Sequence, residues 1–417
     1  MKARVKVFIL QLLSYISLCG VYKYIILEDF EYNGFKYIKN DEKFLIGIII
    51  ILCILLIIML VRDKFWFLVI NIIVTMYLFG SVIYFQFSDG NIKVVLSQVI
   101  LIITLIIFSN INIKNHLNKK NLENNISKKK ILFIFSLGTM IVFIIFYGKY
   151  INLNNLFLID VYETRLIFRE VSISILDYIY APLSRVILPI LLIVYIRDKD
   201  KKKIYIITVC IIISYLFGAN KSTLIGIFTI FLFYKGTYMK KCTNFLMAIL
   251  LAGVLSLIGK ILIGSSYIAN AVLRRVLFLP THLENIYYDF FENNYTYGMH
   301  TDLGTFFGEM KYNKDISRFI GEDIMGKADM NANVGVITEG FFSFGIFGVV
   351  IACIVVGMFF LYLNYMDVNP RYFGVAFTFI YYFNSSFLTT LLLTHGLLCL
   401  VFFIGIFLKN TNREEKT

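Results

Sequence analysis

Basic residues between the apolar stretches are the first candidates for chemistry in this sequence. Arg165 and Arg169 are four residues apart, a spacing that places both side chains on one face of a helix. Arginine offers planar, bidentate donors to phosphate oxygens. Six residues are therefore candidate ligands of an anionic headgroup such as a lipid pyrophosphate: Arg165, Arg169, Arg185, Lys221, Arg274 and Arg275. Glu163 and Glu170 lie close to the first pair, so ion pairing or contact with lipid phosphates at the surface is the alternative.

Three residues are candidates for proton transfer: Glu339, His282 and Glu284. Glu339 stands where the chain enters a long apolar run. A carboxylate at bilayer depth is costly unless it has a task. A position near a helix N-terminus also favours a carboxylate for structural reasons alone, and this explanation stays open.

The segment after Pro280 combines a carboxylate with aromatic residues. If it is helical, Glu284 shares a face with Tyr287, Tyr288 and Phe291. This aromatic face is of the kind that stacks on sugar rings. The same pattern is also typical of an amphipathic helix at the membrane interface.

Neither a metal site nor a cofactor is predicted. The four histidines are spread over different segments, and no pair has metal-ligand spacing. The six cysteines are scattered without a C-x-x-C pair, so they indicate neither a zinc site nor a disulfide framework. We interpret the cysteines as packing residues.

The elements that position these residues are membrane helices. Of the 417 residues, 59% are hydrophobic and only 16% are charged, and the mean hydropathy is +0.77, which excludes an ordinary soluble globular protein. Apolar runs of about 20 residues, long enough to cross a hydrocarbon core, recur along the chain. They predict an all-α, polytopic integral membrane protein with about twelve transmembrane helices, at residues 5–27, 44–61, 65–87, 92–113, 131–148, 182–196, 204–219, 222–235, 244–263, 338–363, 372–387 and 389–408.

The distribution of lysine and arginine predicts the orientation of these helices. Strongly basic gaps such as 114–130 and 197–203 mark cytoplasmic loops and alternate with acidic or mixed gaps. We expect both termini on the cytoplasmic side of the cytoplasmic membrane, and we interpret the net charge of +13 as this asymmetry rather than as a nucleic-acid surface. The chain is expected to form a single membrane domain, residues 1–417.

Two gaps are too long to be mere connectors, and both are expected on the extracytoplasmic side. They are residues 149–181 and residues 264–337, the second lying between helices 9 and 10. The second gap is rich in aromatic residues, which predicts short helices packed on or in the membrane surface rather than disorder.

Two motifs stand out in this layout. The first is Arg-Arg-x-x-x-x-Pro-x-x-x-x-x-x-Tyr-Tyr-x-Phe-Phe at 274–291. The second is Asn-x-Asn-x-Gly-x-x-x-Glu-Gly-x-x-x-Phe-Gly-x-x-Gly at 331–348. With the many-span layout and the large outer loop, they resemble the bacterial O-antigen and capsular polysaccharide repeat-unit polymerases of the Wzy type. The turn at 218–222 is also similar to a turn of that family, with Lys221 where the family usually has arginine.

The resemblance implies a metal-independent glycosyltransferase that needs no cofactor and acts at the outer face of the cytoplasmic membrane. A growing chain would leave undecaprenyl diphosphate and join a hydroxyl of the next lipid-linked repeat unit. The six cations would stabilise the departing pyrophosphate, and Glu339, His282 or Glu284 would accept the hydroxyl proton. Sugar contacts would come from Tyr287, Tyr288, Asn331 and Asn333. The implied partners are lipid-linked oligosaccharide and membrane lipids, with a chain-length regulator and a flippase as further candidates.

Three other functions fit the same layout. A lipid-linked oligosaccharide flippase or other transporter also has about twelve spans, although such carriers usually show repeated halves and charged residues at mid-membrane. The sequence has no visible repeat and few charges deep inside the predicted spans. An O-antigen ligase uses the same donor and is expected to depend on a histidine of the large loop, here His282 or His300. A non-enzymatic membrane scaffold is the third alternative, and the outer cations argue against it.

Overall fold

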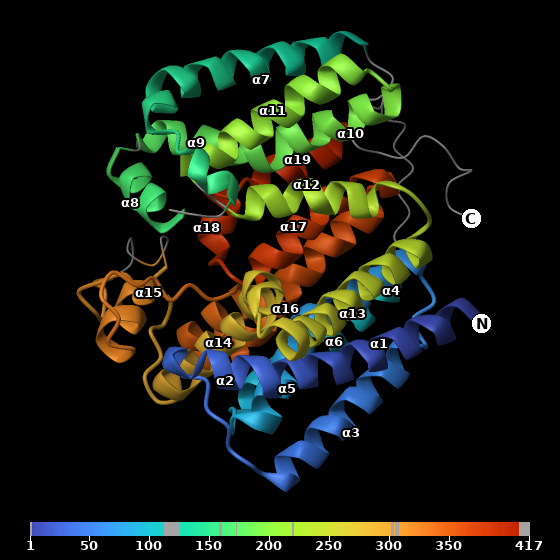
Figure 1. Cartoon of the computed structure of the whole chain (residues 1–417), viewed down its shortest axis with the longest axis vertical. Helices are drawn as coiled ribbons and strands as arrows, with labels where there is room; N and C mark the ends of the chain where they lie inside the picture. Colours follow the sequence, from blue (N-terminus) through green and yellow to red (C-terminus); the bar gives the residue numbers. More distant parts are fainter. Residues whose placement is uncertain are drawn as a thin grey trace. The chain divides into compact units, whose positions relative to one another are not determined.

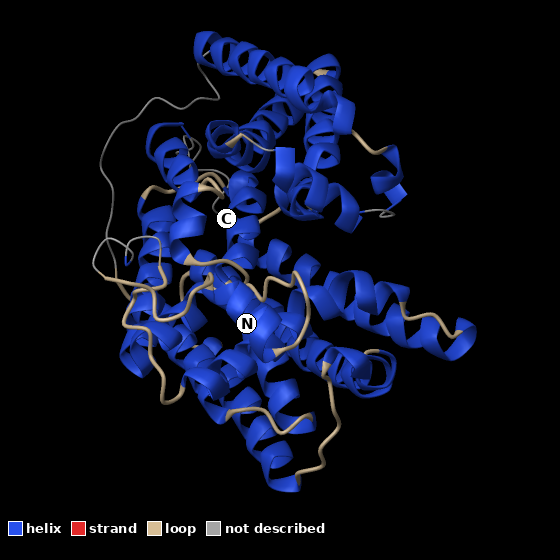
Figure 2. Ribbon diagram, turned by 90° about the vertical axis from the view of Figure 1, so that its left-hand side faces the viewer, coloured by secondary structure: helices blue, strands red, loops and turns tan. Residues whose placement is uncertain are grey.

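The chain folds mainly into helices in the part that the computed structural model describes, which comprises residues 2–111, 126–157, 161–171, 173–218, 221–301, 304 and 308–407. No strand occurs in these ranges, where one isolated bridge pairs Ile38 with Ser88 (Figure 2). The all-α prediction is therefore confirmed.

The helices fall into two compact units. The first unit comprises Met1–Ile113, Tyr238–Tyr362 and Tyr381–Thr389 (Figure 1). Its helices are α1 (Lys2–Val21), α2 (Leu27–Asp29), α3 (Asp41–Ile58), α4 (Lys64–Ile73), α5 (Phe79–Phe87), α6 (Ile92–Ser109), α13 (Tyr238–Ile263), α14 (Leu279–Phe291), α15 (Ile316–Phe319) and α16 (Val336–Tyr365). The π-helical segments Tyr22–Ile26, Val74–Leu78, Ala269–Phe278 and Ile320–Ile324 extend or join these helices.

The second unit comprises Lys114–Thr237, Leu363–Ile380 and Thr390–Thr417. Its helices are α7 (Ile126–Tyr147), α8 (Val161–Val171), α9 (Ser174–Pro182), α10 (Leu188–Asp198), α11 (Lys201–Gly218), α12 (Lys221–Tyr234) and α19 (Leu397–Phe407), together with most of α17 (Phe373–Phe383) and α18 (Leu388–Leu393). The π-helical turn Leu183–Ile187 joins α9 to α10. The predicted loop 149–181 is thus largely helical where it is described.

Seven helices among the described residues are long and apolar enough to cross a membrane. They are Lys2–Asp29, Lys64–Phe87, Ile92–Ser109, Ile126–Tyr150, Tyr178–Asp198, Tyr238–Ile263 and Val336–Tyr365. The other five predicted spans fall on α3 and α11, which begin with three charged residues each, and on α12, α17 and the α18–α19 pair, which are shorter. These helices indicate a membrane protein, and the total of twelve spans stays a prediction.

The core of the first unit is built around the α4–α5 rod. Every residue from 65 to 87 is buried, as expected of a helix that is apolar on all sides. Helix α1 packs along α13, and α13 packs along α4. A polar contact fixes the register inside this apolar core, because Gln11 Nε2 donates to Asn71 Oδ1 at 2.9 Å.

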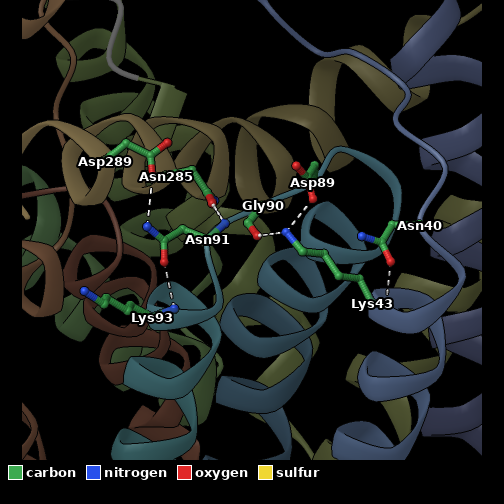
Figure 3. A network of polar contacts seen from close by, with 8 residues as sticks. All are labelled: Asn40, Lys43, Asp89, Gly90, Asn91, Lys93, Asn285 and Asp289. Carbon is green, nitrogen blue, oxygen red and sulfur yellow. Dashed lines mark hydrogen bonds and ion pairs between the residues drawn. The ribbon is translucent and has the colours of Figure 1, made fainter.

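The predicted large loop, residues 264–337, contains several short helical segments in its described part. Its first part runs from the π-helical segment Ala269–Phe278 directly into α14, and α14 packs against α5 and α6. The turn between α5 and α6 fixes α14 in place, since Asn91 N–H donates to Asn285 Oδ1 at 2.7 Å and Asn91 Nδ2 donates to Asp289 Oδ1 at 2.8 Å (Figure 3). Lys43 of α3 donates to the Gly90 carbonyl in the same turn. Helices α5 and α6 and the turn between them therefore position α14, and Lys43 of α3 holds that turn in place.

Helix α16 is broken near its start, where the sequence predicts a continuous span over 338–363. Phe344 and Gly345 leave the helical conformation, and Gly345 has φ +61° and ψ −144°, a combination that favours glycine. The break folds residues 336–343 back against the rest of the helix. A Cβ atom on Gly340 would lie 2.4 Å from the Gly348 carbonyl oxygen, so these glycines permit the close approach.

Candidate functional site

Arg274 is a buried arginine at the start of the α14 region. It is 8% exposed and lies in the π-helical segment Ala269–Phe278. Its Nε donates to Asn270 Oδ1 at 2.9 Å, and its guanidinium carbon lies 4.4 Å from the centroid of the Phe30 ring. Burial lowers the pKa of Arg274, and the charge of Arg275 lowers it further. An anion that reached this guanidinium would relieve both effects.

Two of the acidic residues near Phe30 are engaged elsewhere. Lys260 forms ion pairs with Asp29 and, at 3.7 Å, with Glu28. Within the described part of the chain neither Arg274, the exposed Arg275 nor Glu31, which follows Phe30, forms an ion pair. Arg274 is therefore a buried cation without an ion pair among the described residues.

His282 lies two turns further along, in α14, in a closed environment. Its Nδ1 is 3.0 Å from Tyr84 Oη, and its ring packs 4.8 Å from the Phe35 ring. Burial lowers the pKa of His282 to about 4, with a further lowering by Lys327, while a hydrogen bond with the Asn33 backbone opposes the shift. The imidazole is therefore neutral at physiological pH and is a weak base.

Lys327 is a cation that sequence reasoning missed. Its Nζ lies 3.5 Å from Asn33 Oδ1, beside the segment that contacts His282. It was not singled out because a lysine in a Gly-Lys-Ala-Asp stretch looks like an ordinary exposed loop residue. Its position extends the positive potential from Arg274 toward the start of α14.

Glu284 faces the protein interior. It is 2% exposed, and its nearest described polar partner is Gln98, whose Nε2 is 3.5 Å from Glu284 Oε2. Burial raises the pKa of Glu284 to about 8, an effect that the Gln98 contact only partly offsets. The carboxyl is therefore protonated near neutral pH and is unsuited to accept a proton there.

The predicted sugar-stacking tyrosines are core residues. The Tyr287 hydroxyl donates to the Ala332 carbonyl at 2.8 Å, and the Tyr288 hydroxyl donates to Ser97 Oγ at 2.8 Å. The Tyr288 ring stacks on Phe341 with centroids 3.7 Å apart. Both tyrosines are enclosed by protein, so a sugar ring has no access to them. The prediction of an aromatic helical face is correct, but this face packs against α16 instead of facing a ligand.

The Glu339 side chain lines a cavity beside the broken start of α16. The cavity has a volume of about 470 Å³. Its described lining consists of residues of α16 together with Tyr297, Gly298, Met299, Thr301, Gly304 and Leu388. Glu339 Oε2 accepts the Leu388 N–H at 2.6 Å, which gives the carboxylate a structural role at the start of α18. A carboxylate can accept about four hydrogen bonds, so Glu339 can hold more than one partner at a time.

The rim and floor of the cavity carry further polar and aromatic groups. Ser343 is one helical turn after Glu339 and is 4% exposed, and its Oγ has no hydrogen-bond partner. Tyr297 and Phe344 line the opening and are 66% and 48% exposed. The Tyr297 N–H donates to the Ser343 carbonyl at 2.9 Å, which ties the two walls together. No lysine or arginine is among the described residues that line the cavity.

Asn331 and Asn333 precede this cavity wall in the chain. Asn333 is exposed and Asn331 is half-buried. The intervening Ala332 is fixed by its N–H bond to the Ser317 carbonyl at 2.9 Å and by the Tyr287 hydroxyl. Both asparagine side chains are thus placed where a soluble group can reach them.

The other predicted cations lie in the second unit. Arg165 is half-buried on α8. Arg185 lies in the π-helical turn Leu183–Ile187. The backbones of Arg169 and Lys221 are in α8 and α12, and their side chains lie outside the described part.

The predicted residues are therefore not gathered into one cluster. Arg274, Arg275 and His282 share the N-terminal end of the α14 region, whereas Glu339, Asn331 and Asn333 belong to its other end. His300 lies near the cavity, but its Nε2 accepts the Tyr312 N–H at 3.0 Å. Sequence reasoning missed Ser343, Tyr297 and Phe344. A possible signal was the group of glycines at 298, 304, 340, 345 and 348, because close backbone packing often surrounds a binding site.

Comparison with known proteins gives no family. The chain matches no protein-family model, no curated protein and no solved structure. Among the described residues no group of His, Cys, Asp and Glu side chains is suited to hold a metal ion. The functional argument therefore depends on the site geometry and on the sequence motifs.

Proposed function

We propose that this protein is a glycosyltransferase of the cytoplasmic membrane that polymerises oligosaccharide repeat units linked to undecaprenyl diphosphate. In this proposal both termini are cytoplasmic, and residues 264–337 face the outside. Chain-length regulators and flippases are proposed partners.

The observation that carries the proposal is the burial of Arg274 without an ion pair among the described residues. Burying a charge is costly unless it is paired. Glu28 and Asp29, which could compensate it, pair with Lys260 instead. A dianionic pyrophosphate at the surface of a membrane-embedded unit supplies the missing charge, and the bidentate geometry of arginine suits phosphate oxygens.

The proposed reaction transfers a sugar chain from one lipid carrier to another. The bond between the anomeric carbon of the growing chain and the pyrophosphate oxygen breaks, and the bonding electrons leave with undecaprenyl diphosphate. A new bond forms between that carbon and a hydroxyl oxygen of the incoming repeat unit, while the hydroxyl proton passes to a protein base. Positioned cations lower the barrier by stabilising the charge that develops on the leaving group.

Glu339 is the proposed proton acceptor. His282 is disfavoured because its conjugate acid has a pKa of about 4, and Glu284 is disfavoured because it is itself protonated near neutral pH. Of these three candidates, Glu339 alone lines the cavity.

The experiment is complementation of a deletion strain, with the size distribution of surface and lipid-linked glycans as the readout. Arg274→Gln, which preserves side-chain bulk, and Arg274→Ala are expected to lower polymer formation roughly 10- to 100-fold, because a charge-assisted contact with the pyrophosphate of a lipid-linked substrate is lost. Arg318→Gln is the matched control, because Arg318 is an exposed arginine of α15, in the same unit, that contacts Glu322 at 3.7 Å. Single repeat units should accumulate at the outer face.

The same experiment distinguishes the alternatives. Repeat units trapped on the cytoplasmic side would indicate a flippase. Long lipid-linked chains that fail to reach their final acceptor would indicate a ligase. Unchanged glycans in both Arg274 variants would reject the proposed function.

A further inference from the structure

We infer that the cavity beside Glu339 binds a neutral sugar ring at the non-reducing end of the acceptor repeat unit, while Arg274 holds the pyrophosphate of that same acceptor. The inference rests on the proposed function for the identity of the ligand. It places the acceptor substrate along α14, with its pyrophosphate at Arg274 and its terminal sugar in the cavity beside Glu339.

The length of the α14 region supports this assignment. Tyr288 follows Arg274 by 14 residues, which is about 20 Å along a helix. Tyr288 stacks directly on Phe341, in the short helix that carries Glu339. The pyrophosphate of a donor must lie next to the reacting hydroxyl, because it leaves from the attacked carbon. The pyrophosphate of an acceptor is instead separated from that hydroxyl by the whole repeat unit, as Arg274 is from Glu339 by most of α14.

The chemistry of the cavity fits a neutral, hydroxylated ring. Ser343 Oγ is buried and unpartnered, which is unfavourable until a ligand hydroxyl meets it. Glu339, one turn away, can accept a hydrogen bond from the same ring. The exposed rings of Tyr297 and Phe344 at the opening offer apolar faces to the C–H side of a sugar.

The cavity itself is not built to hold a pyrophosphate. Its described lining contains a carboxylate and no lysine or arginine, so it offers a pyrophosphate no cationic ligand. The volume of about 470 Å³ lies within the range of roughly 300–1,000 Å³ that is usual for small-molecule sites.

The first test measures glycoside binding to the full chain in lipid nanodiscs. Saturation-transfer NMR would compare p-nitrophenyl β-glycosides of glucose, galactose and N-acetylglucosamine with p-nitrophenol alone. Ile351→Trp should weaken glycoside binding at least 10-fold, because Ile351 lines the cavity and its substitution fills the space. Ile354→Trp is the matched control, since Ile354 is similarly exposed on the same helix but does not line the cavity.

A second variant removes one polar group without filling the cavity. Ser343→Ala should weaken glycoside binding about 2- to 10-fold, the usual effect of one hydrogen bond. Absence of binding by all three glycosides, equal binding of p-nitrophenol, or equal loss in Ile351→Trp and Ile354→Trp would overturn the sugar site, whether or not the protein is a polymerase.

The second test assigns the substrate. Transfer from a lipid-linked polymer to a labelled single repeat unit would be measured with each substrate varied in turn. Ile351→Trp and Ser343→Ala should raise KM for the acceptor and leave KM for the donor unchanged. A rise in KM for the donor alone would overturn the direction proposed here, and absence of transfer by the wild type would reject the proposed function while leaving the glycoside result standing.

Discussion

The two regions that lie at either end of the helical segment 269–291 differ in charge. At the first end, Arg274 is buried beside Arg275, with Lys327 further along, and Glu28 and Asp29 pair with Lys260. At the other end, Glu339 lines a cavity whose described walls carry no cation. A ligand that satisfies both ends must be anionic at one end and neutral and hydroxylated at the other. This separation is what a lipid-linked oligosaccharide offers.

The largest effect on the transfer rate is expected from Glu339→Gln, which changes the proposed proton acceptor at the cavity. Glutamine preserves an acceptor for the Leu388 N–H and for a sugar hydroxyl, but it cannot take up a proton. We expect kcat to fall about 100-fold, the lower limit for loss of general base catalysis, with little change in KM for either substrate. The measurement is single-turnover transfer between lipid-linked substrates.

The control for that variant is Glu322→Gln, which changes an acid of the same unit that pairs with Lys314. An unchanged kcat in Glu339→Gln would restrict Glu339 to a structural role at the start of α18 and would leave the proton acceptor unassigned.

A smaller effect is expected from Gly345→Ala, which strains the cavity end alone. Gly345 has φ +61°, and a Cβ atom there would lie 2.8 Å from the Tyr295 ring. We expect a lower Tm and glycoside binding weakened a few-fold, with pyrophosphate binding unchanged. Gly138→Ala on α7 is the control, because a Cβ atom there meets no neighbour within 4 Å and alanine favours the helix. Equal effects on both ligands would mean that the two ends are not independent.

The smallest expected effect is a pH-dependent change in Tm on substitution of Glu284, in the middle of α14. Burial raises the pKa of Glu284 from 4.5 to about 8, so the folded chain retains a proton that the unfolded chain releases. The resulting stabilisation is fully present below about pH 4.5 and is lost as the pH rises to about 8. Glu284→Gln should remove this part of the pH dependence and raise Tm by a few degrees at pH 8. A Tm difference between the variant and the wild type that does not change between pH 5 and 8 would contradict the buried, protonated carboxyl.

The sequence was sufficient to predict the helical class and several details of this region. Long apolar runs predict helices because a helix satisfies its backbone hydrogen bonds internally. The segment that carries Glu284, Tyr287, Tyr288 and Phe291 is helical as predicted. The motif that begins with Arg274 contains a buried arginine without an ion pair among the described residues. In these cases the signal is local, since helix periodicity and an unexpected charge are visible in a short window.

What could not be predicted depends on tertiary contacts. An aromatic face looks the same in sequence whether it stacks on sugars or, as with Tyr288, on Phe341. The break at Phe344 and Gly345 lies inside an apolar run that fits one unbroken span, so the exposure of Phe344 and the unpartnered hydroxyl of Ser343 were not foreseeable. Packing between distant segments likewise determines that Glu28 and Asp29 pair with Lys260. Arg274 is left without an ion pair among the described residues.

The most direct test of the central claim is a binding matrix of two ligands and two variants in nanodiscs. Inorganic pyrophosphate and the best p-nitrophenyl glycoside would be titrated against the wild type, Arg274→Gln and Ile351→Trp. We predict that Arg274→Gln weakens pyrophosphate binding at least 10-fold and leaves glycoside binding unchanged. Ile351→Trp should weaken glycoside binding at least 10-fold and leave pyrophosphate binding unchanged. Loss of both ligands in one variant, or of neither ligand in both variants, would contradict the separation of charge along α14.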